Sequence, residues 1–105
     1  ATWCMPCVAE LPSINKMYLA LKDENIAFFL ISNESIDKVE KYHTKKKYQI
    51  PFYIIDDKGN IPSVYFSPSI PTTFIINKKG EIIRKSFGAE NWDNKEFIEE
   101  LKKLL

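Results

Sequence analysis

The sequence has almost no net charge, no long apolar run and few residues able to bind a metal. Its 15 lysines and arginines are balanced by 14 aspartates and glutamates, so the basic surplus that nucleic acid attracts is missing. The only run of one sign, residues 45–47, is interpreted as the solvated end of a helix. Apolar stretches stay far below the about 20 residues of a membrane-spanning helix. These absences predict a globular domain without a nucleic-acid partner.

Cysteine is also scarce: the chain has 2 cysteines, Cys4 and Cys7, and 1 histidine, His43. A disulfide that closes so small a loop adds little stability, because stabilisation grows with loop length. A structural zinc site needs about four ligands. A c-type haem needs histidine directly after the second cysteine, where Val8 stands. We therefore expect no metal and no organic cofactor, and we interpret the two cysteines as a reactive pair.

The rest of the chain indicates one domain that mixes helices and strands. With 105 residues and no repeats or linkers, it fits a single compact domain, residues 1–105. Apolar periodicity and short apolar runs predict the following elements, with Asp93 and Glu96 as a capping pair at the start of the last helix. The expected helices cover residues 7–23, 35–47 and the C-terminal segment after 93, and the expected strands cover 26–31, 52–55, 73–76 and 81–84.

The order of these elements predicts a mixed sheet. Strands that alternate with helices favour parallel pairing, and the turn at 77–80 favours an antiparallel hairpin. The polar segment 56–59 should end the second strand, and 60–69 should form an irregular helical turn and loop. A helix that carries a catalytic cysteine pair normally follows a buried strand, which residues 1–3 are too short to supply. We therefore expect a strand upstream of Ala1 in the intact protein.

The spacing of the cysteines predicts redox chemistry. At a helix N-terminus, unpaired N–H groups and the helix dipole favour a thiolate, so the pKa of the Cys4 thiol should lie below its free value of about 8.5. The Cys4 thiolate would attack a disulfide, and Cys7, one turn later, would resolve the mixed disulfide. Pro6 stiffens the intervening turn. Trp3 would shield one side of the sulfur and offer a flat apolar contact to a substrate.

These residues resemble the thioredoxin superfamily, and within it the TlpA/ResA/DsbE-like group of exported bacterial thiol–disulfide oxidoreductases. Residues 1–12, ATWCMPCVAELP, are similar to the active-site segment of that group. Residues 69–76 are similar to its cis-proline loop and next strand, and 79–83 with Gly88 to its hairpin and following glycine. The resemblance covers nearly the whole chain. It implies a thioredoxin-like three-layer α/β/α sandwich with a mixed central sheet, here without its N-terminal strand or strands.

The resemblance also implies roles for individual residues. The bond before Pro71 would be cis, and the backbone of Ile70, with Thr72, would hold an extended substrate chain. Glu10, one turn after Cys7, would be partly desolvated, with a raised pKa, and would take the Cys7 proton during resolution. The pattern alone favours a solvated glutamate equally.

We thus predict an enzyme, a thiol–disulfide oxidoreductase of the protein-disulfide reductase type. Its partners would be a cysteine-containing protein substrate and an upstream thiol reductant, for which a membrane-embedded protein would fit. The resemblance favours a monomeric reductant in the periplasm or another exported, oxidising compartment, with a membrane tether outside this chain as an option. A cytoplasmic location is the alternative. Thiol redox homeostasis and cytochrome maturation are the processes that such a group implies.

Two other functions stay open. A metallochaperone-like module of the same fold would hold Cu(I) through the two thiolates, although no third ligand is evident. A peroxide-reducing relative would need Thr or Ser a few residues before a lone reactive cysteine, and Thr2 does not fit. Away from the cysteines, we expect His43 to pack or lie on a helix surface and Trp92 to fix the terminal helix. Tyr65 and Phe66 should rim the active site or pack in the core.

Overall fold

A computed structural model describes residues 1–55 and 61–105 of the chain. Helix α1 (Met5–Leu21) begins earlier than the predicted start at Cys7, because Cys4 itself is the N-cap residue. Its Sγ accepts a hydrogen bond from the Cys7 N–H at 3.3 Å. Pro6 occupies the first turn, where a helix needs no N–H donor, and the helix continues through Pro12. Among the described residues, no helix is long and apolar enough to span a membrane.

Helix α2 (Ile36–Lys46) lies where the sequence predicted it. Ser35 occupies the N-cap position, although its side chain makes no capping hydrogen bond, and Lys47 ends the helix in the left-handed region at φ 58°. His43, on the last turn, packs its ring on neighbouring aromatic side chains, and its Nε2 lies 2.6 Å from the carbonyl oxygen of Ile50. Of the two positions expected for His43, packed or on a helix surface, the structure shows the packed one.

Helix α3 (Lys95–Lys103) ends the chain, but it is capped differently from the prediction. The side chain of Asn94 accepts a hydrogen bond from the Phe97 N–H at 3.1 Å, so Asn94 is the N-cap. The predicted pair of Asp93 and Glu96 is therefore wrong by one residue. Both asparagine and aspartate cap helices well, and the local pattern did not distinguish the two adjacent positions.

The first two strands form a short parallel pair. In β1 (Leu30–Ser32) and β2 (Phe52–Ile54), Leu30 lies opposite Phe52. Strand β1 is shorter than the predicted 26–31, because only its last part finds partners on β2. The segment 56–59, predicted to end the second strand, lies outside the described residues.

The last two strands form the predicted antiparallel hairpin, in which β3 (Thr72–Ile76) pairs with β4 (Ile82–Phe87). Asn77 stabilises the turn, because its side-chain oxygen accepts hydrogen bonds from the backbone N–H groups of residues 79 and 81. The turn of 3-10 helix at Ser63–Tyr65 confirms the helical turn expected before the hairpin.

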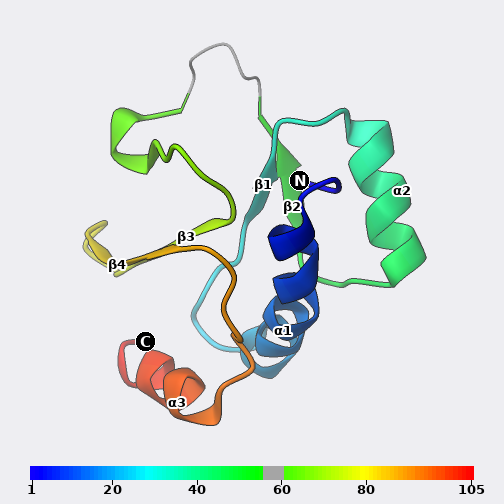
Figure 1. The fold of residues 1–105 in the computed structure, drawn as a ribbon. Coiled ribbons are helices and arrows are strands. Elements are labelled where there is room, and N and C mark those ends of the chain that lie inside the picture. Colours follow the sequence, from blue (N-terminus) through cyan, green and yellow to red (C-terminus); the bar gives the residue numbers. More distant parts are fainter. Residues whose placement is uncertain (56–60) are drawn as a thin grey trace.

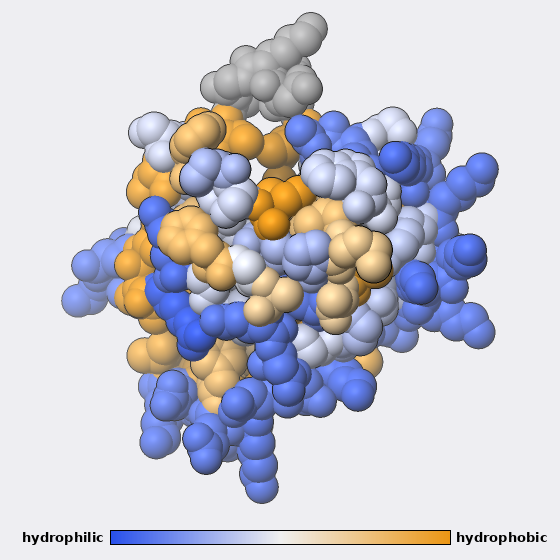
Figure 2. All heavy atoms as spheres, viewed as in Figure 1, coloured by the Kyte–Doolittle hydropathy of each residue, from blue (hydrophilic) through white to orange (hydrophobic). Residues whose placement is uncertain are grey.

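Within the described residues, the four strands pair as two separate two-stranded sheets rather than as one continuous sheet. Figure 1 shows the β3–β4 hairpin on one side of the β1–β2 pair and α2 on the other. Apolar side chains reach the surface around the strands, whereas polar side chains cover α2 and α3 (Figure 2). The exposed strand residues include Ile31, Tyr53, Ile76, Ile83 and Phe87.

The hydrophobic core lies where α1, α3 and Trp92 meet. Trp92 is 2% exposed, and the centroid of its ring lies 5.4 Å from the centroid of the Phe97 ring on α3. Trp92 therefore holds α3 against the core, as predicted. The buried side of α1 also contributes to this cluster. Its buried members are Ile14, Met17, Leu21, Ile50, Trp92, Ile98 and Leu101. This core fixes α1, and with it the cysteines at its N-terminus.

Candidate functional site

Cys4 and Cys7 form a disulfide at the N-terminus of α1, with their Cα atoms 5.2 Å apart. Both are nearly buried, at 5% and 7% exposed. The Cys4 Sγ accepts a hydrogen bond from the Cys7 backbone N–H. The Cys4 sulfur therefore lies against the unpaired N–H donors of the first helical turn. Helix N–H groups and the positive end of the dipole stabilise a thiolate at this position once the disulfide is reduced.

Two large apolar side chains beside the disulfide are open to solvent. Trp3 is 68% exposed and Met5 is 79% exposed, although both flank a buried cysteine. Pro6 separates Met5 from Cys7 in the first turn. An incoming polypeptide would therefore meet apolar surface next to the sulfurs.

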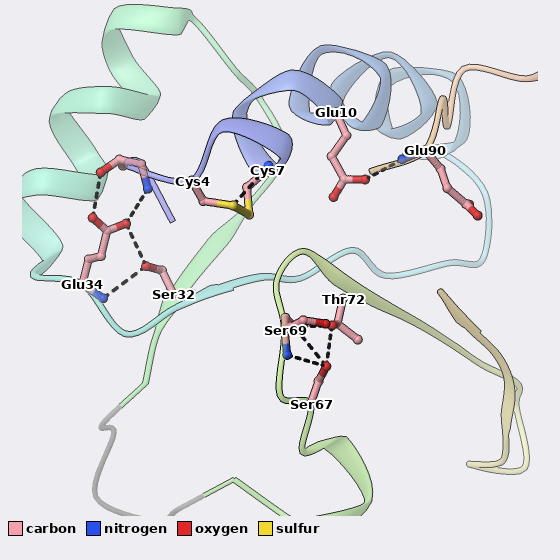
Figure 3. The surroundings of a disulfide bond; sticks show 10 residues. Cys4, Cys7, Glu10, Ser32, Glu34, Ser67, Ser69, Thr72 and Glu90 are labelled. Carbon is pink, nitrogen blue, oxygen red and sulfur yellow. Dashed lines mark hydrogen bonds between the residues drawn. A yellow bond between two sulfur atoms is a disulfide. The ribbon is translucent and has the colours of Figure 1, made fainter. Parts of the chain in front are cut away.

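Glu10 is a buried carboxylate one helical turn beyond Cys7, at 5% exposure. The two side chains project from the same side of α1 (Figure 3), as residues three apart on a helix do. Its Oε2 accepts hydrogen bonds from the Trp92 indole N–H at 2.9 Å and from the Glu90 backbone N–H at 3.2 Å. The Trp92 contact was not foreseen, because the two residues are distant in sequence.

The surroundings of Glu10 raise the pKa of its carboxyl above the ordinary value of 4.5. Burial raises the pKa of this carboxyl, the hydrogen bonds from Trp92 and Glu90 act against that rise, and the nearby charge of Glu90 adds to it. The net pKa shift is upward, as the resemblance to the thioredoxin superfamily implied. A carboxyl with a raised pKa is suited to hold and release a proton closer to neutral pH.

A second nearly buried carboxylate, Glu34, contacts the residue that precedes Trp3. Its side chain is 8% exposed, and it accepts two hydrogen bonds from Thr2, one from the backbone N–H and one from the hydroxyl, both at 2.7 Å. Sequence reasoning missed this residue. The available signal was its position directly after an apolar strand and before a helix cap.

The loop before β3 carries the cis peptide bond between Ile70 and Pro71. The Thr72 hydroxyl donates to the Ser69 carbonyl at 2.7 Å and lies 2.8 Å from the Ser67 hydroxyl, so its side chain is occupied within this loop (Figure 3). Gly88 on the hairpin donates to the Pro71 carbonyl at 2.9 Å. Ile70 is 48% exposed, so its apolar side chain is accessible on this loop.

The aromatic residues ahead of this loop separate into one exposed and one packed side chain. Phe66 is 70% exposed, which excludes core packing for that residue. The Tyr65 ring lies edge-on to Phe74, with centroids 5.3 Å apart. Among residues 1–55 and 61–105, no group of three or more His, Cys, Asp or Glu side chains could hold a metal ion.

Comparisons with known sequences find one matching family. Residues 1–85 match the model of the AhpC/TSA family. Thiol-disulfide oxidoreductase ResA of Bacillus thuringiensis subsp. konkukian is 33% identical over 105 residues, covering 98% of this chain and 58% of that protein. Sporulation thiol-disulfide oxidoreductase A of Bacillus subtilis is 31% identical over 104 residues, covering 94% of this chain and 62% of that protein. The chain thus spans little more than half the length of these curated relatives.

Two solved structures share the fold of this chain. StoA from Bacillus subtilis superposes with a TM-score of 0.74 at 29% identity, over 98% of this chain and 75% of the StoA chain. A DsbE-type structure from Chlorobium tepidum gives a TM-score of 0.78 at 20% identity, over 97% of this chain and 72% of that one. At that identity, the second match speaks for the fold alone.

Proposed function

The chain belongs to the AhpC/TSA family and has a thioredoxin-like fold, and on this premise we propose that it is a thiol–disulfide oxidoreductase that reduces disulfides in protein substrates. The observation that carries the proposal is the disulfide at the start of α1, whose leading sulfur accepts a helix N–H. A dithiol in this position combines a stabilised thiolate with a resolving partner one turn away.

The reaction passes two electrons from the dithiol to the substrate. The Cys4 thiolate attacks one sulfur of a substrate disulfide, which forms a mixed disulfide and releases the other substrate sulfur as a thiolate. The Cys7 sulfur, once deprotonated, attacks the Cys4 sulfur and releases the second substrate thiolate. The Cys4–Cys7 disulfide remains, and an upstream thiol reductant restores the dithiol by the reverse exchange.

Glu10 is proposed to take the Cys7 proton in the second step. Cys7 is the later nucleophile and is 7% exposed, so bulk water is a poor acceptor for its proton. The Glu10 carboxylate, on the same side of α1, offers an acceptor whose pKa is raised towards that of a thiol. Glu10 then gives this proton to a departing substrate thiolate, which leaves as a thiol.

Substrate contacts are proposed for Trp3, Pro6 and the Ile70–Thr72 segment. The exposed Trp3 ring and Ile70 side chain offer apolar surface to residues that flank the substrate cysteine. Backbone groups of Ile70 and Thr72 would pair with an extended substrate chain as a strand does. Because the Thr72 hydroxyl is bonded within its own loop, we assign the Thr72 contact to its backbone.

The wider setting is also a proposal. The family group suggests a monomeric, single-domain reductant that works in an exported compartment such as the periplasm and receives electrons from a membrane-embedded thiol reductase. A strand upstream of Ala1 would complete the sheet. This is supported by the two described sheets, which do not pair with each other, and by the exposed apolar residues on their strands.

The test compares the wild-type protein with two variants that each keep a single cysteine. Reduced wild-type protein should reduce insulin disulfides catalytically, and Cys4→Ser and Cys7→Ser should each abolish turnover. Cys7→Ser should accumulate a mixed disulfide with the substrate, detected by mass spectrometry, whereas Cys4→Ser should not. Turnover retained in either variant would refute the proposal. Stoichiometric Cu(I) binding without disulfide turnover, or peroxide reduction in its place, would identify one of the two rival functions.

A further inference from the structure

Glu34 binds the chain segment that delivers the active-site cysteine. Its Oε1 accepts the Thr2 backbone N–H and its Oε2 accepts the Thr2 hydroxyl, each at 2.7 Å. Distances this short are typical of charge-assisted hydrogen bonds to a carboxylate. Thr2 thus donates a hydrogen bond to each carboxylate oxygen of Glu34. The next residue along the chain is the solvent-exposed Trp3.

Glu34 is itself held in place by neighbouring residues on β1 and α2. Glu34 lies between β1 and α2, and its backbone N–H donates to the Ser32 hydroxyl at 3.1 Å. The Lys38 ammonium, one turn into α2, lies 3.3 Å from Oε2. Burial would raise the pKa of Glu34, but the hydrogen bonds from Thr2 and the nearby Lys38 outweigh it and lower the pKa, so the group is ionised at neutral pH.

Thr2 belongs to the turn that ends at the reactive cysteine. The Cys4 N–H donates to the Ala1 carbonyl at 3.1 Å, which closes a turn with Thr2 and Trp3 at its centre. Cys4 leaves this turn as the N-cap of α1. In the described structure, Thr2 makes its hydrogen bonds to Glu34. Without them, no hydrogen bond of Thr2 among the described residues would hold the middle of the turn. The N-terminus of α1 would then be free to fray.

We propose that Glu34 is a positioning residue for the disulfide exchange: by clamping Thr2, it holds the Ala1–Cys4 turn closed and keeps the Cys4 sulfur against the N–H groups of α1. The inference rests on the proposed function. It adds a residue outside the cysteine segment and the loop of Pro71. Glu34 does not touch the reacting sulfurs in this role, and it acts through the backbone of the turn.

The sign of one measurement separates this clamp from a simple charge effect. A carboxylate disfavours a neighbouring thiolate, so removal of its charge alone would lower the pKa of the Cys4 thiol. Loss of the clamp would remove helix N–H groups from the sulfur and raise that pKa towards its free value. Glu34→Gln removes the charge but keeps the geometry, because the amide oxygen can accept the Thr2 N–H while the amide N–H group donates to the Thr2 hydroxyl.

The experiment measures how the rate of Cys4 alkylation by iodoacetamide depends on pH, in the full chain with a Cys7→Ser background. Added Glu34→Ala should raise the midpoint by about one pH unit, which is a tenfold loss of thiolate at pH values below both midpoints. Added Glu34→Gln should leave the midpoint at or below that of the background. Glu40→Ala, which removes an exposed carboxylate from α2, is the matched control for charge and should behave like the background. Glu10, on α1, is unchanged in all of these proteins.

Thr2→Val serves as a milder variant in case Glu34→Ala does not fold, which circular dichroism would detect. It keeps the backbone hydrogen bond, loses the hydroxyl one, and should raise the midpoint by a smaller amount. A midpoint that stays or falls in Glu34→Ala, or in Thr2→Val if that variant replaces it, overturns the clamp. A rise in Glu34→Gln equal to that in Glu34→Ala also overturns it. The titration needs no disulfide turnover, so its result is independent of the insulin assay that tests the proposed function.

Discussion

The two nearly buried glutamates near the disulfide, Glu10 and Glu34, have pKa shifts of opposite sign. Glu10 accepts two hydrogen bonds, both from neutral N–H donors and both on Oε2, and it lies near the like charge of Glu90. Glu34 accepts hydrogen bonds on both oxygens and has Lys38 within 3.3 Å. The pKa of Glu10 is raised and that of Glu34 is lowered, both from an ordinary value of 4.5.

Burial alone therefore does not decide what a carboxylate near the active site can do. The number of donors and the sign of the nearest charge decide whether desolvation is overcome. A carboxyl left short of donors is suited to exchange a proton, and one with a full set of donors and a cation is suited to hold a backbone in place. Substitutions at the two sites, and at their donors, can break or sharpen this division of roles.

The largest difference should appear in the second step of the exchange. Glu10→Gln cannot accept the Cys7 proton, so resolution of a preformed Cys4 mixed disulfide should slow by about 10²-fold or more at neutral pH, the range of general base catalysis. Glu34→Gln should slow it far less. Stopped-flow release of a chromophoric thiol from the mixed disulfide gives the rate.

The pH profile identifies the cause of this loss. In wild-type protein, the resolution rate should fall as pH drops through the raised pKa of Glu10, and Glu10→Gln should lack that limb. Glu40→Gln, which alters an exposed carboxylate, is the control and should keep the wild-type profile. An unchanged rate and profile in Glu10→Gln would show that Glu10 moves no proton.

The next largest effect is on stability, and it concerns the hydrogen bond from the Trp92 indole N–H to Glu10. Trp92→Phe removes the indole N–H from Oε2 and leaves one donor on a buried carboxylate. Because hydrogen bonds to charged groups contribute about 1.5–3 kcal/mol, we expect the free energy of unfolding to fall by about 2 kcal/mol. The same substitution at Trp3, which is 68% exposed, should cost little. Urea unfolding at neutral pH measures both, and equal losses would refute the role of the indole donor.

The two carboxylates should also give stability curves of opposite slope. For Glu10, whose folded pKa is raised, the stabilising contribution is complete below 4.5 and is lost as pH rises through the folded pKa. For Glu34, whose folded pKa is lowered, the contribution is present above 4.5 and is lost as pH falls through the folded pKa. A tenfold difference in proton affinity between the folded and unfolded chain corresponds to about 1.4 kcal/mol of stability.

The opposite slopes are tested by measuring the free energy of unfolding between about pH 3 and 7. The proteins compared are wild type, Glu10→Gln and Glu34→Gln. The difference between wild type and Glu10→Gln should decrease with rising pH, and that between wild type and Glu34→Gln should increase. Parallel curves would mean that the environments of the two groups do not differ as described.

The sequence was informative about features that depend on neighbours along the chain. Helical spacing predicted α1, the turn at 77–80 predicted the hairpin, and two cysteines three apart predicted the disulfide. Each of these depends on residues within a few positions of one another, where periodicity and turn chemistry operate. The same reasoning failed by one residue at Asn94, because adjacent capping residues compete locally.

Features built from distant residues were not predictable. The Trp92–Glu10 and Thr2–Glu34 hydrogen bonds join residues 82 and 32 positions apart, and neither leaves a periodic trace in the sequence. Strand β1 was predicted too long for a related reason. The apolar run 26–31 shows where a strand can form, but the reach of β2 decides how much of it pairs.

The smallest expected effect concerns the cation that distinguishes the Glu34 site. Lys38→Met removes an ammonium that is 57% exposed, and exposed ion pairs one helical turn apart contribute about 0.3–0.5 kcal/mol. The Thr2 hydrogen bonds are more buried and should hold without it, so Lys38→Met should lower the free energy of unfolding by less than about 0.5 kcal/mol at low salt. The pH midpoint of Cys4 alkylation should not rise, because the clamp on Thr2 stays closed. If Lys38→Met instead raised that midpoint as far as Glu34→Ala does, the ammonium would be what holds the carboxylate in place, and the hydrogen bonds to Thr2 would be insufficient without it.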